Sequence, residues 1–309
     1  MRAARALAGV AERVLPALPA IWHGPIAEAV GTLAYLAAPR ARAAVRANLA
    51  IAAADRPDRA ALVRRTFVNQ VRAYLEIFRI PRLDAEQLAA SIRLDGWENF
   101  TKAHARGHGV ILASAHLGPV AVVGQLVLTR GYGLTLPVEP AESELMRVVN
   151  RARSAHGLRL VPTDSALGIH RTLRRGGVLG ILVDRAVSGV GERVDLLGRE
   201  ALLPSAHVAL ALHTGAALLP AFAWREGGAL VGRIEAPFAI PRTGDRDADV
   251  REGVRRFAAI LGGYLHRFPD QWTVFEPVWS PAEAVASRAA TSPGVPSGTT
   301  PAAENPRRY

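Results

Sequence analysis

From residue 110 onward, short apolar runs typical of buried strands alternate with longer amphipathic stretches typical of helices. Strands that are joined through a helix usually run parallel within one sheet, because the crossover returns the chain to the edge where the first strand began. We therefore predict an α/β fold with a largely parallel or mixed central sheet flanked by helices. The expected strands cover residues 110–113, 134–138, 158–161, 178–183, 217–224 and 229–235. Residues 190–204 are expected to form an extended loop or a hairpin beside the sheet.

The first hundred residues are predicted to be helical, with helices over 26–38, 40–53 and 58–78. The stretch 14–38 is mostly apolar, but His23, Glu28 and three prolines interrupt it. Such a segment suits the membrane interface better than a span across the bilayer. We expect residues 1–55 to form membrane-associating helices. The apolar stretch after the basic start is broken too early to be a secretory signal peptide.

Beyond residue 279 the composition changes to alanine, proline, serine, threonine and glycine without apolar periodicity. Such a segment cannot bury enough apolar surface to offset the entropy lost on ordering, so residues 280–309 are predicted to be a disordered tail. Residues 1–279 are expected to form one domain. The chain contains no cysteine, which excludes disulfides, thiolate metal sites and cysteine nucleophiles.

The formal net charge at pH 7 is +11, and arginine carries almost all of it because Lys102 is the sole lysine. Guanidinium groups pair with carboxylates and phosphates, so an anionic partner is expected. Aromatic residues make up 6% of the chain and do not alternate with the arginines, which argues against a nucleic-acid groove. With 50% hydrophobic residues and a mean hydropathy of +0.13, the chain favours an anionic membrane surface as partner, and no nucleic acid.

The predicted strand that begins at residue 110 leads to His116, and Gly118-Pro119 turns the chain directly afterwards. This pattern predicts a buried strand that delivers an imidazole to the carboxyl edge of the sheet, where open α/β sheets bind their ligands. An imidazole at that place can take up and return a proton near neutral pH. The alternative is a strand-end histidine bonded to a backbone carbonyl, and the local pattern is compatible with both.

Asp184 and Arg185 follow the strand predicted over 178–183. Because the carboxyl ends of parallel strands meet at one edge, Asp184 can lie beside His116. A carboxylate bonded to the far ring nitrogen would fix the tautomer and stabilise the imidazolium during proton transfer. Alternatively, Asp184 caps a helix or pairs with Arg185.

Glu139 follows the strand predicted over 134–138, and Arg151 and Arg153 lie on the helix predicted after it. Arginines at such a rim commonly clamp phosphate, although a solvated helix face explains the same spacing. Trp272, after Pro269, is expected to be a packing anchor. The histidines show no i, i+4 pair on a predicted helix, so no metal site is expected.

Several short motifs follow one another in a fixed order: Ala38-Pro39-Arg40, Ala47-Asn48-Leu49, Gly107-His108-Gly109-Val110-Ile111-Leu112, Ala115-His116-Leu117-Gly118, Val183-Asp184-Arg185, Val194-Asp195-Leu196-Leu197-Gly198, Leu203-Pro204, Thr214-Gly215-Ala216, Leu219-Pro220 and Pro269-Asp270-Gln271-Trp272. In this order they resemble the lysophospholipid acyltransferase-like superfamily. The specific resemblance is to the lipid A biosynthesis (lauroyl/myristoyl) acyltransferases and the phosphatidylinositol mannoside acyltransferases. It covers about residues 25–279.

The resemblance implies an O-acyltransferase that moves a fatty acyl group from a thioester donor to a hydroxyl of a membrane glycolipid or lysophospholipid. Acyl carrier protein or coenzyme A would carry the acyl group as co-substrate, with no further cofactor. The family's catalytic histidine maps onto His116 as general base, with Asp184 at the rim beside it. Glu139, Arg153 and Arg185 would bind substrate near the acceptor head group. The resemblance also implies a peripheral or monotopic protein at the cytoplasmic face of the cell inner membrane.

One position departs from the family pattern of a histidine followed five positions later by aspartate or glutamate, because Ala121 stands at the acidic position. That carboxylate normally orients the histidine. Three interpretations follow. Asp184 takes over the role of the missing carboxylate, or the enzyme is slow, or the chain is a catalytically impaired paralogue that acts as a lipid-binding protein.

Overall fold

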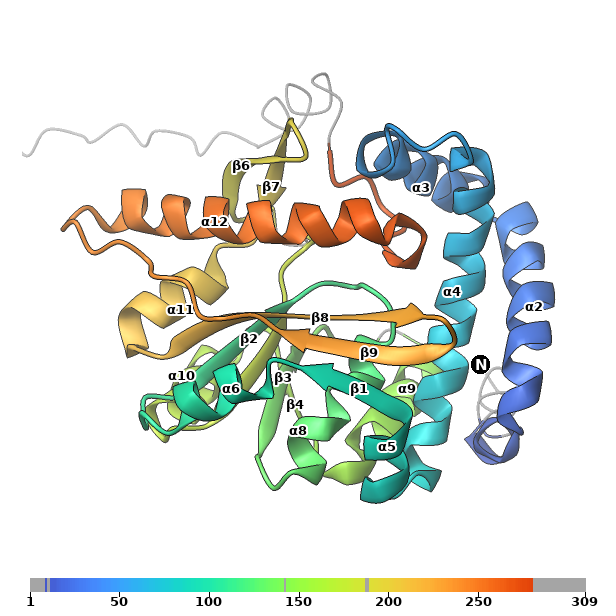
Figure 1. Ribbon diagram of the computed structural model, residues 1–309, viewed down its shortest axis with the longest axis horizontal. Coiled ribbons are helices and arrows are strands. Elements are labelled where there is room, and N and C mark those ends of the chain that lie inside the picture. Colours follow the sequence, from blue (N-terminus) through green and yellow to red (C-terminus); the bar gives the residue numbers. More distant parts are fainter. Residues whose placement is uncertain (1–8, 10–11, 142, 187–188, 280–309) are drawn as a thin grey trace, which may run out of the picture. The chain divides into compact units, whose positions relative to one another are not determined.

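The computed structural model describes residue 9 and residues 12–141, 143–186 and 189–279 of the chain (Figure 1). The tail predicted over 280–309 lies outside the described residues. Within the segment 1–55, residues 1–8, 10 and 11 lie outside them as well.

A seven-stranded sheet forms the centre of the fold, in the order β1-β9-β8-β2-β5-β3-β4. Strands β8, β2, β5, β3 and β4 run parallel to one another. Strand β9 returns antiparallel to β8, and β1 runs parallel to β9 at the edge. The prediction of a largely parallel, mixed α/β sheet is therefore confirmed. The strands of this sheet are β1 (Ile92–Asp95), β2 (Val110–Ser114), β3 (Leu134–Val138), β4 (Arg159–Pro162), β5 (Val178–Leu182), β8 (Ala217–Glu226) and β9 (Ala229–Ile234).

Strand β1 corrects the prediction that the first hundred residues are helical. Its four residues include one buried side chain, Ile92, and the strand lies at the edge of the sheet. A strand of this length without an apolar run carries no recognisable period. Its pairing with β9, where Ile92 lies opposite Leu230, comes from tertiary contact with a strand far along the chain.

Helices cover both faces of the sheet, because successive side chains of each strand point to opposite sides. Ile111 and Ala113 of β2 join one core with α10 (Ala166–Arg174), α11 (Ala206–Thr214) and α12 (Arg246–Arg267). Val110 and Leu112 join another core on the opposite face. The helices associated with that face are α5 (Ala85–Ser91), α6 (Trp97–His104), α7 (Val120–Val123), α8 (Gln125–Thr129) and α9 (Glu144–Arg153). Helices α7 and α8 are short and meet at Gly124.

Three N-terminal helices pack at the carboxyl edge of the parallel strands (Figure 1). They are α2 (His23–Ala37), α3 (Pro39–Ala52) and α4 (Arg59–Arg79). Helix α2 lies against α4 and turns Val30, Leu33 and Leu36 toward solvent, with exposed fractions of 46%, 65% and 61%. In the described part of the chain, no helix is both long and apolar enough to cross a bilayer. Membrane association of these helices stays a prediction.

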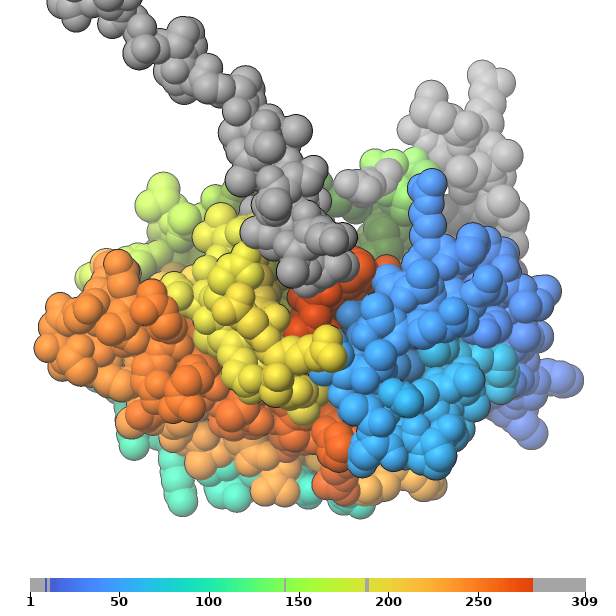
Figure 2. All heavy atoms as spheres, turned by 90° about the horizontal axis from the view of Figure 1, so that it is seen from above, coloured from blue at the N-terminus to red at the C-terminus, as the bar shows by residue number. Residues whose placement is uncertain are grey.

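A β-hairpin and the last described segment complete the fold near α3. The hairpin consists of β6 (Glu192–Leu196) and β7 (Arg199–Leu203), as one of the two expectations for residues 190–204 had it. Figure 2 shows the segment after α12, in red, between this yellow hairpin and the blue N-terminal helices. Asn48 donates to the carbonyls of Val274 and Glu276, and Trp279 Nε1 donates to the Leu196 carbonyl at 3.3 Å. The end of the described chain is therefore tied to both elements.

Candidate active site

His116 lies two residues beyond β2, whose five residues are all buried. The chain then turns through Gly118, which has a φ of 58°. A Cβ atom at this glycine would lie 2.5 Å from the Ala223 carbonyl oxygen of β8, so a larger residue would displace the turn. The buried strand and the glycine turn together hold the imidazole at the carboxyl edge of the sheet, with 31% of its side chain exposed.

Asp184 lies two residues beyond β5, the neighbour of β2, and its side chain is fully buried. One carboxylate oxygen, Oδ1, is 2.9 Å from Nδ1 of the His116 ring. The other, Oδ2, accepts the backbone N–H of His116 at 2.9 Å. The structure thus brings together the two residues predicted to meet at this edge. These contacts differ from both alternatives for Asp184, which were a helix cap and an ion pair with Arg185.

Trp272 supplies a third hydrogen bond to Asp184, donated from the indole Nε1 to Oδ2 at 2.8 Å. The indole is buried, as expected of a packing anchor, but it also has a polar role that the sequence analysis missed. Burial opposes ionisation of Asp184. The charge of His116 and the hydrogen bonds from its ring, from Trp272 and from the His116 backbone outweigh that penalty, so the pKa of Asp184 is lowered. The carboxylate is therefore ionised near neutral pH.

The backbone around Trp272 also closes the His116 loop. Gly118 N–H donates to the Gln271 carbonyl and Thr273 N–H donates to the His116 carbonyl, each at 2.9 Å. Leu117 and Trp272 form the antiparallel bridge between these bonds. The only sequence signal for this contact is the Pro269-to-Trp272 motif, which says nothing of its partner.

Ala121, at the position where a carboxylate is expected from the resemblance, lies in α7 and packs against an apolar core. It lines an apolar cavity between the sheet and α7, α8 and α9. This cavity contains about 860 Å³ of unfilled space, part of it open to solvent. Ser114 and Leu182 line it as well, and each lies two residues before a member of the His116–Asp184 pair. The cavity therefore approaches the pair from the sheet side.

Arg153, the last residue of α9, also lines this cavity. Its burial lowers the pKa of its guanidinium, which nevertheless stays strongly basic. Among the described residues, its Nε has no hydrogen-bond partner. Arg153 is therefore a buried cation in a mostly apolar wall. Arg151 on the same helix instead forms a bidentate ion pair with Glu12 at 2.8 and 2.9 Å.

Arg185 and Glu139 lie together at the same edge of the sheet. Arg185 Nη2 donates to Glu139 at 3.2 Å, and Nη1 donates to Glu276 at 3.1 Å. Arg185 is thus held between two exposed carboxylates, next in sequence to Asp184. The five residues predicted for the site, His116, Asp184, Glu139, Arg153 and Arg185, all lie on this edge or on the cavity beside it.

This arrangement can carry out general base catalysis. Asp184 is hydrogen-bonded to Nδ1 of the ring. The second ring nitrogen, Nε2, is then free to accept a proton from an incoming proton donor. The ionised carboxylate would then stabilise the imidazolium that forms. An apolar cavity beside such a base suits a substrate with an apolar chain near its reacting atom.

Comparison with known proteins finds relatives that are named acyltransferases. The phosphatidylinositol mannoside acyltransferase of Mycolicibacterium smegmatis (strain ATCC 700084 / mc(2)155) is 28% identical over 233 residues, which cover 73% of this chain and 74% of the relative. The protein of the same name from Mycobacterium tuberculosis (strain ATCC 25618 / H37Rv) is 27% identical over 217 residues, or 67% of each chain.

The family model described as bacterial lipid A biosynthesis acyltransferase matches residues 4–280, nearly the whole chain. The match confirms the resemblance drawn from the ordered motifs and identifies an enzyme that transfers acyl groups to lipids. The chain therefore belongs to the bacterial lipid A biosynthesis acyltransferase family.

Proposed function

We propose that this protein transfers a fatty acyl group from a thioester, on acyl carrier protein or coenzyme A, to a hydroxyl of a membrane glycolipid or lysophospholipid. His116 Nε2 removes the proton of the acceptor hydroxyl as the oxygen attacks the thioester carbonyl. The C–O bond forms and the C–S bond breaks. The proton then passes from His116 to the departing thiolate, so the enzyme is unchanged and no acyl-enzyme forms.

The contact between His116 Nδ1 and Asp184 Oδ1 carries this proposal. It gives the family's histidine a buried carboxylate from β5, although Ala121 leaves the usual acidic position without one. In this chain Asp184 therefore takes over the orienting role, which favours an active enzyme over the impaired paralogue.

The apolar cavity supports the assignment of the donor. Its walls come mainly from aliphatic side chains of the sheet and of α7 and α8, so it can hold the hydrocarbon chain of the donor. We assign Arg153, Glu139 and Arg185 to substrate binding. Glu139 and Arg185 supply charged groups at the rim, and Arg153 supplies a buried cation on the cavity wall, for the polar head group that the resemblance implies.

The N-terminal helices support a membrane location. Val30, Leu33 and Leu36 form an exposed apolar row at helical spacing on α2, and arginines lie on the adjoining α3. Apolar side chains that enter the interface and cations that attract anionic lipid give peripheral binding without a membrane span. We propose a peripheral or monotopic protein at the cytoplasmic face of the inner membrane, where the thioester donors are made.

An acyl-transfer assay on purified protein with anionic vesicles tests the proposal. The donors are palmitoyl thioesters of acyl carrier protein and of coenzyme A. The acceptors are lipid A precursors, lysophospholipids and phosphatidylinositol mannosides, and mass spectrometry reads the products. His116→Ala should abolish the product. His108→Ala is the matched control, since His108 is exposed and precedes the opposite end of the same strand.

A new acylated lipid that disappears in His116→Ala and persists in His108→Ala would support the proposal. Equal product from wild type and His116→Ala would refute the mechanism. Bound lipid without product from any donor would instead assign the chain to the lipid-binding paralogues.

A further inference from the structure

A second cavity lies on the other side of α7 from the apolar one, between α2, α4, α5 and the turn that joins β8 to β9. It contains about 1550 Å³ of unfilled space, part of it open to solvent. Arg72 and Arg79 of α4, Arg225 of β8 and His23 of α2 all line it. No residue of the His116–Asp184 pair is among its walls, so the cavity is separate from the candidate active site.

Positive charge is concentrated in this cavity. Glu76 is the carboxylate among the lining side chains, and Arg225 already binds it through Nε at 2.9 Å and Nη2 at 2.5 Å. In the described part of the chain, Arg72 and Arg79 have no ion pair. Among the described residues, these two guanidinium charges therefore have no counterion. They come from one face of α4, because residues seven apart lie two turns apart on the same side.

Two buried nitrogen atoms of residues that line the cavity also lack a described partner. Nη1 of Arg225 is buried and has no hydrogen bond among the described residues, although the other two nitrogens of that guanidinium are satisfied. Nε2 of His23 is likewise buried without a described partner, and the whole residue is 6% exposed. A buried polar atom without a partner costs about 1–3 kcal/mol, so such atoms normally have a hydrogen-bond partner.

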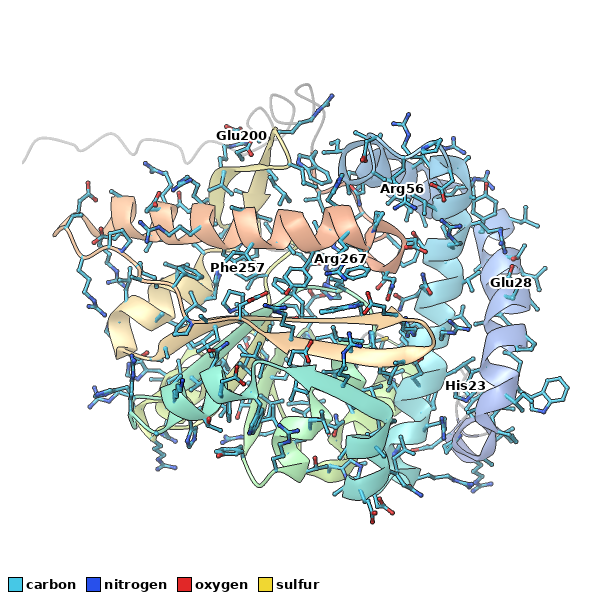
Figure 3. All side chains as sticks on the ribbon, viewed as in Figure 1. His23, Glu28, Arg56, Glu200, Phe257 and Arg267 are labelled. Carbon is cyan, nitrogen blue, oxygen red and sulfur yellow. The ribbon has the colours of Figure 1, made fainter. Side chains whose placement is uncertain are left out.

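The geometry lets these groups act together. Figure 3 shows His23 on α2 where that helix faces α4, and a Cβ atom at Gly24 would lie 3.4 Å from Arg72 Nη2. The Arg72 guanidinium therefore reaches the start of α2. Burial lowers the pKa of His23, and the nearby charges of Arg79 and Arg72 lower it further. An anion in the cavity would reverse that effect of the arginines.

We propose that this cavity binds a phosphate ester. A phosphate group presents three or more oxygens in different directions, which matches donors that approach from α2, α4 and β8. A carboxylate, with two oxygens in one plane, would satisfy fewer of them. The phosphate can belong to a lipid head group or to the phosphorylated carrier of a thioester. Exposed Ile21 and Trp22 adjoin His23, so the cavity lies next to an apolar surface.

Isothermal titration of the full chain with three probes tests this inference. The probes are inorganic phosphate, coenzyme A with a free thiol, and short-chain phosphatidylglycerol below its micellar concentration. The variants Arg72→Gln and Arg79→Gln each remove a partly buried arginine without a described ion pair, so both should fold. Each should weaken binding about tenfold, the effect expected for one charged hydrogen bond.

Arg59→Gln is the matched control. It removes the same charge from the same helix at an exposed site about 20 Å from Arg72, given a rise of about 1.5 Å per residue. Tighter binding of coenzyme A than of phosphatidylglycerol would assign the phosphate to the thioester carrier, and the reverse would assign it to a lipid.

Absence of saturable binding for all three probes would overturn the inference. Equal weakening by Arg59→Gln and Arg72→Gln would also overturn it, because the effect would then be long-range charge alone. The inference does not depend on acyl transfer. A protein that binds phosphate through Arg72 and transfers no acyl group would refute the proposed function and leave this site in place.

Discussion

The His116–Asp184 pair differs from the cavity lined by Arg72, Arg79 and Arg225, here called the cationic cavity, in how its buried polar atoms are hydrogen-bonded. Both oxygens of Asp184 are bonded, one to the His116 ring and one to two N–H groups. In the cationic cavity, Arg225 Nη1 and His23 Nε2 have no partner among the described residues. Groups bonded within the protein are held ready for a reaction. In the cavity, Arg72 and Arg79, which have no described ion pair, are available to the phosphate ester proposed above.

Replacement of Asp184 by asparagine should have the largest effect on the first of these regions. An amide cannot stabilise the imidazolium, so kcat/KM for acyl transfer should fall by about four orders of magnitude, as in triad enzymes with the same change. Asp164→Asn is the control, because Asp164 also lies two residues beyond a parallel strand but is exposed. If both variants kept wild-type activity, Asp184 would have no catalytic role.

In the cationic cavity, a substitution should change the stability of the fold. Glu76→Gln would leave Arg225 as an unpaired charge in a wall where their side chains are 14% and 9% exposed. The free energy of unfolding, measured in urea, should fall by about 3 kcal/mol. Glu226→Gln offers a contrast, because Glu226 pairs with Arg93 and Arg267 at the surface and its loss should change little. Equal effects of the two variants would contradict the distinction.

His207 tests a buried histidine that belongs to neither region. Burial lowers its pKa from 6.5 to about 3, and its ring packs against Phe257. Between those pH values the unfolded chain binds a proton that the folded chain does not, so stability must decrease as the pH falls. From pH 7 to pH 5 this residue should cost about 2 kcal/mol. Urea unfolding of His207→Leu should lack that part of the pH dependence, and an unchanged pH dependence would refute the assignment.

Trp272→Phe should give the smallest effect, because it keeps the packing and removes one of three hydrogen bonds to Asp184. We expect kcat/KM to fall about tenfold. The acidic limb of its pH profile should move to higher pH, since the indole contributes to the lowered pKa of Asp184. Trp279→Phe removes an indole bonded to the Leu196 carbonyl and should leave that profile unchanged. Identical profiles for both variants and the wild type would make Trp272 a packing residue only.

Much of the sheet could be predicted because its parallel strands are buried on both faces. The strand predicted over 178–183, for example, is one residue shorter in the structure and ends at Leu182. The meeting of His116 and Asp184 followed from the same reasoning, since parallel neighbours share one edge. Strand β1 escaped prediction because Ile92 is its sole buried residue.

The contacts that complete both regions could not be predicted from the sequence, for a different reason. Trp272 and Asp184 are 88 residues apart, and Arg225 and Glu76 are 149 apart. Hydrophobic periodicity reports which face of an element is buried but not which distant side chain meets it. The motif at Pro269 marked Trp272 as notable, and no pattern linked the arginines of α4 with Arg225.

The closure of the His116 loop by the segment around Trp272 has a consequence for synthesis. Thr273 follows His116 by 157 residues, and its N–H binds the His116 carbonyl. At about 5–20 residues per second, a ribosome needs on the order of 10–30 s to make that stretch. The sheet edge with His116 therefore leaves the ribosome before Trp272, whose indole donates a hydrogen bond to Asp184. The contacts that close the His116 loop therefore form only after α12 and the segment that follows it have left the ribosome.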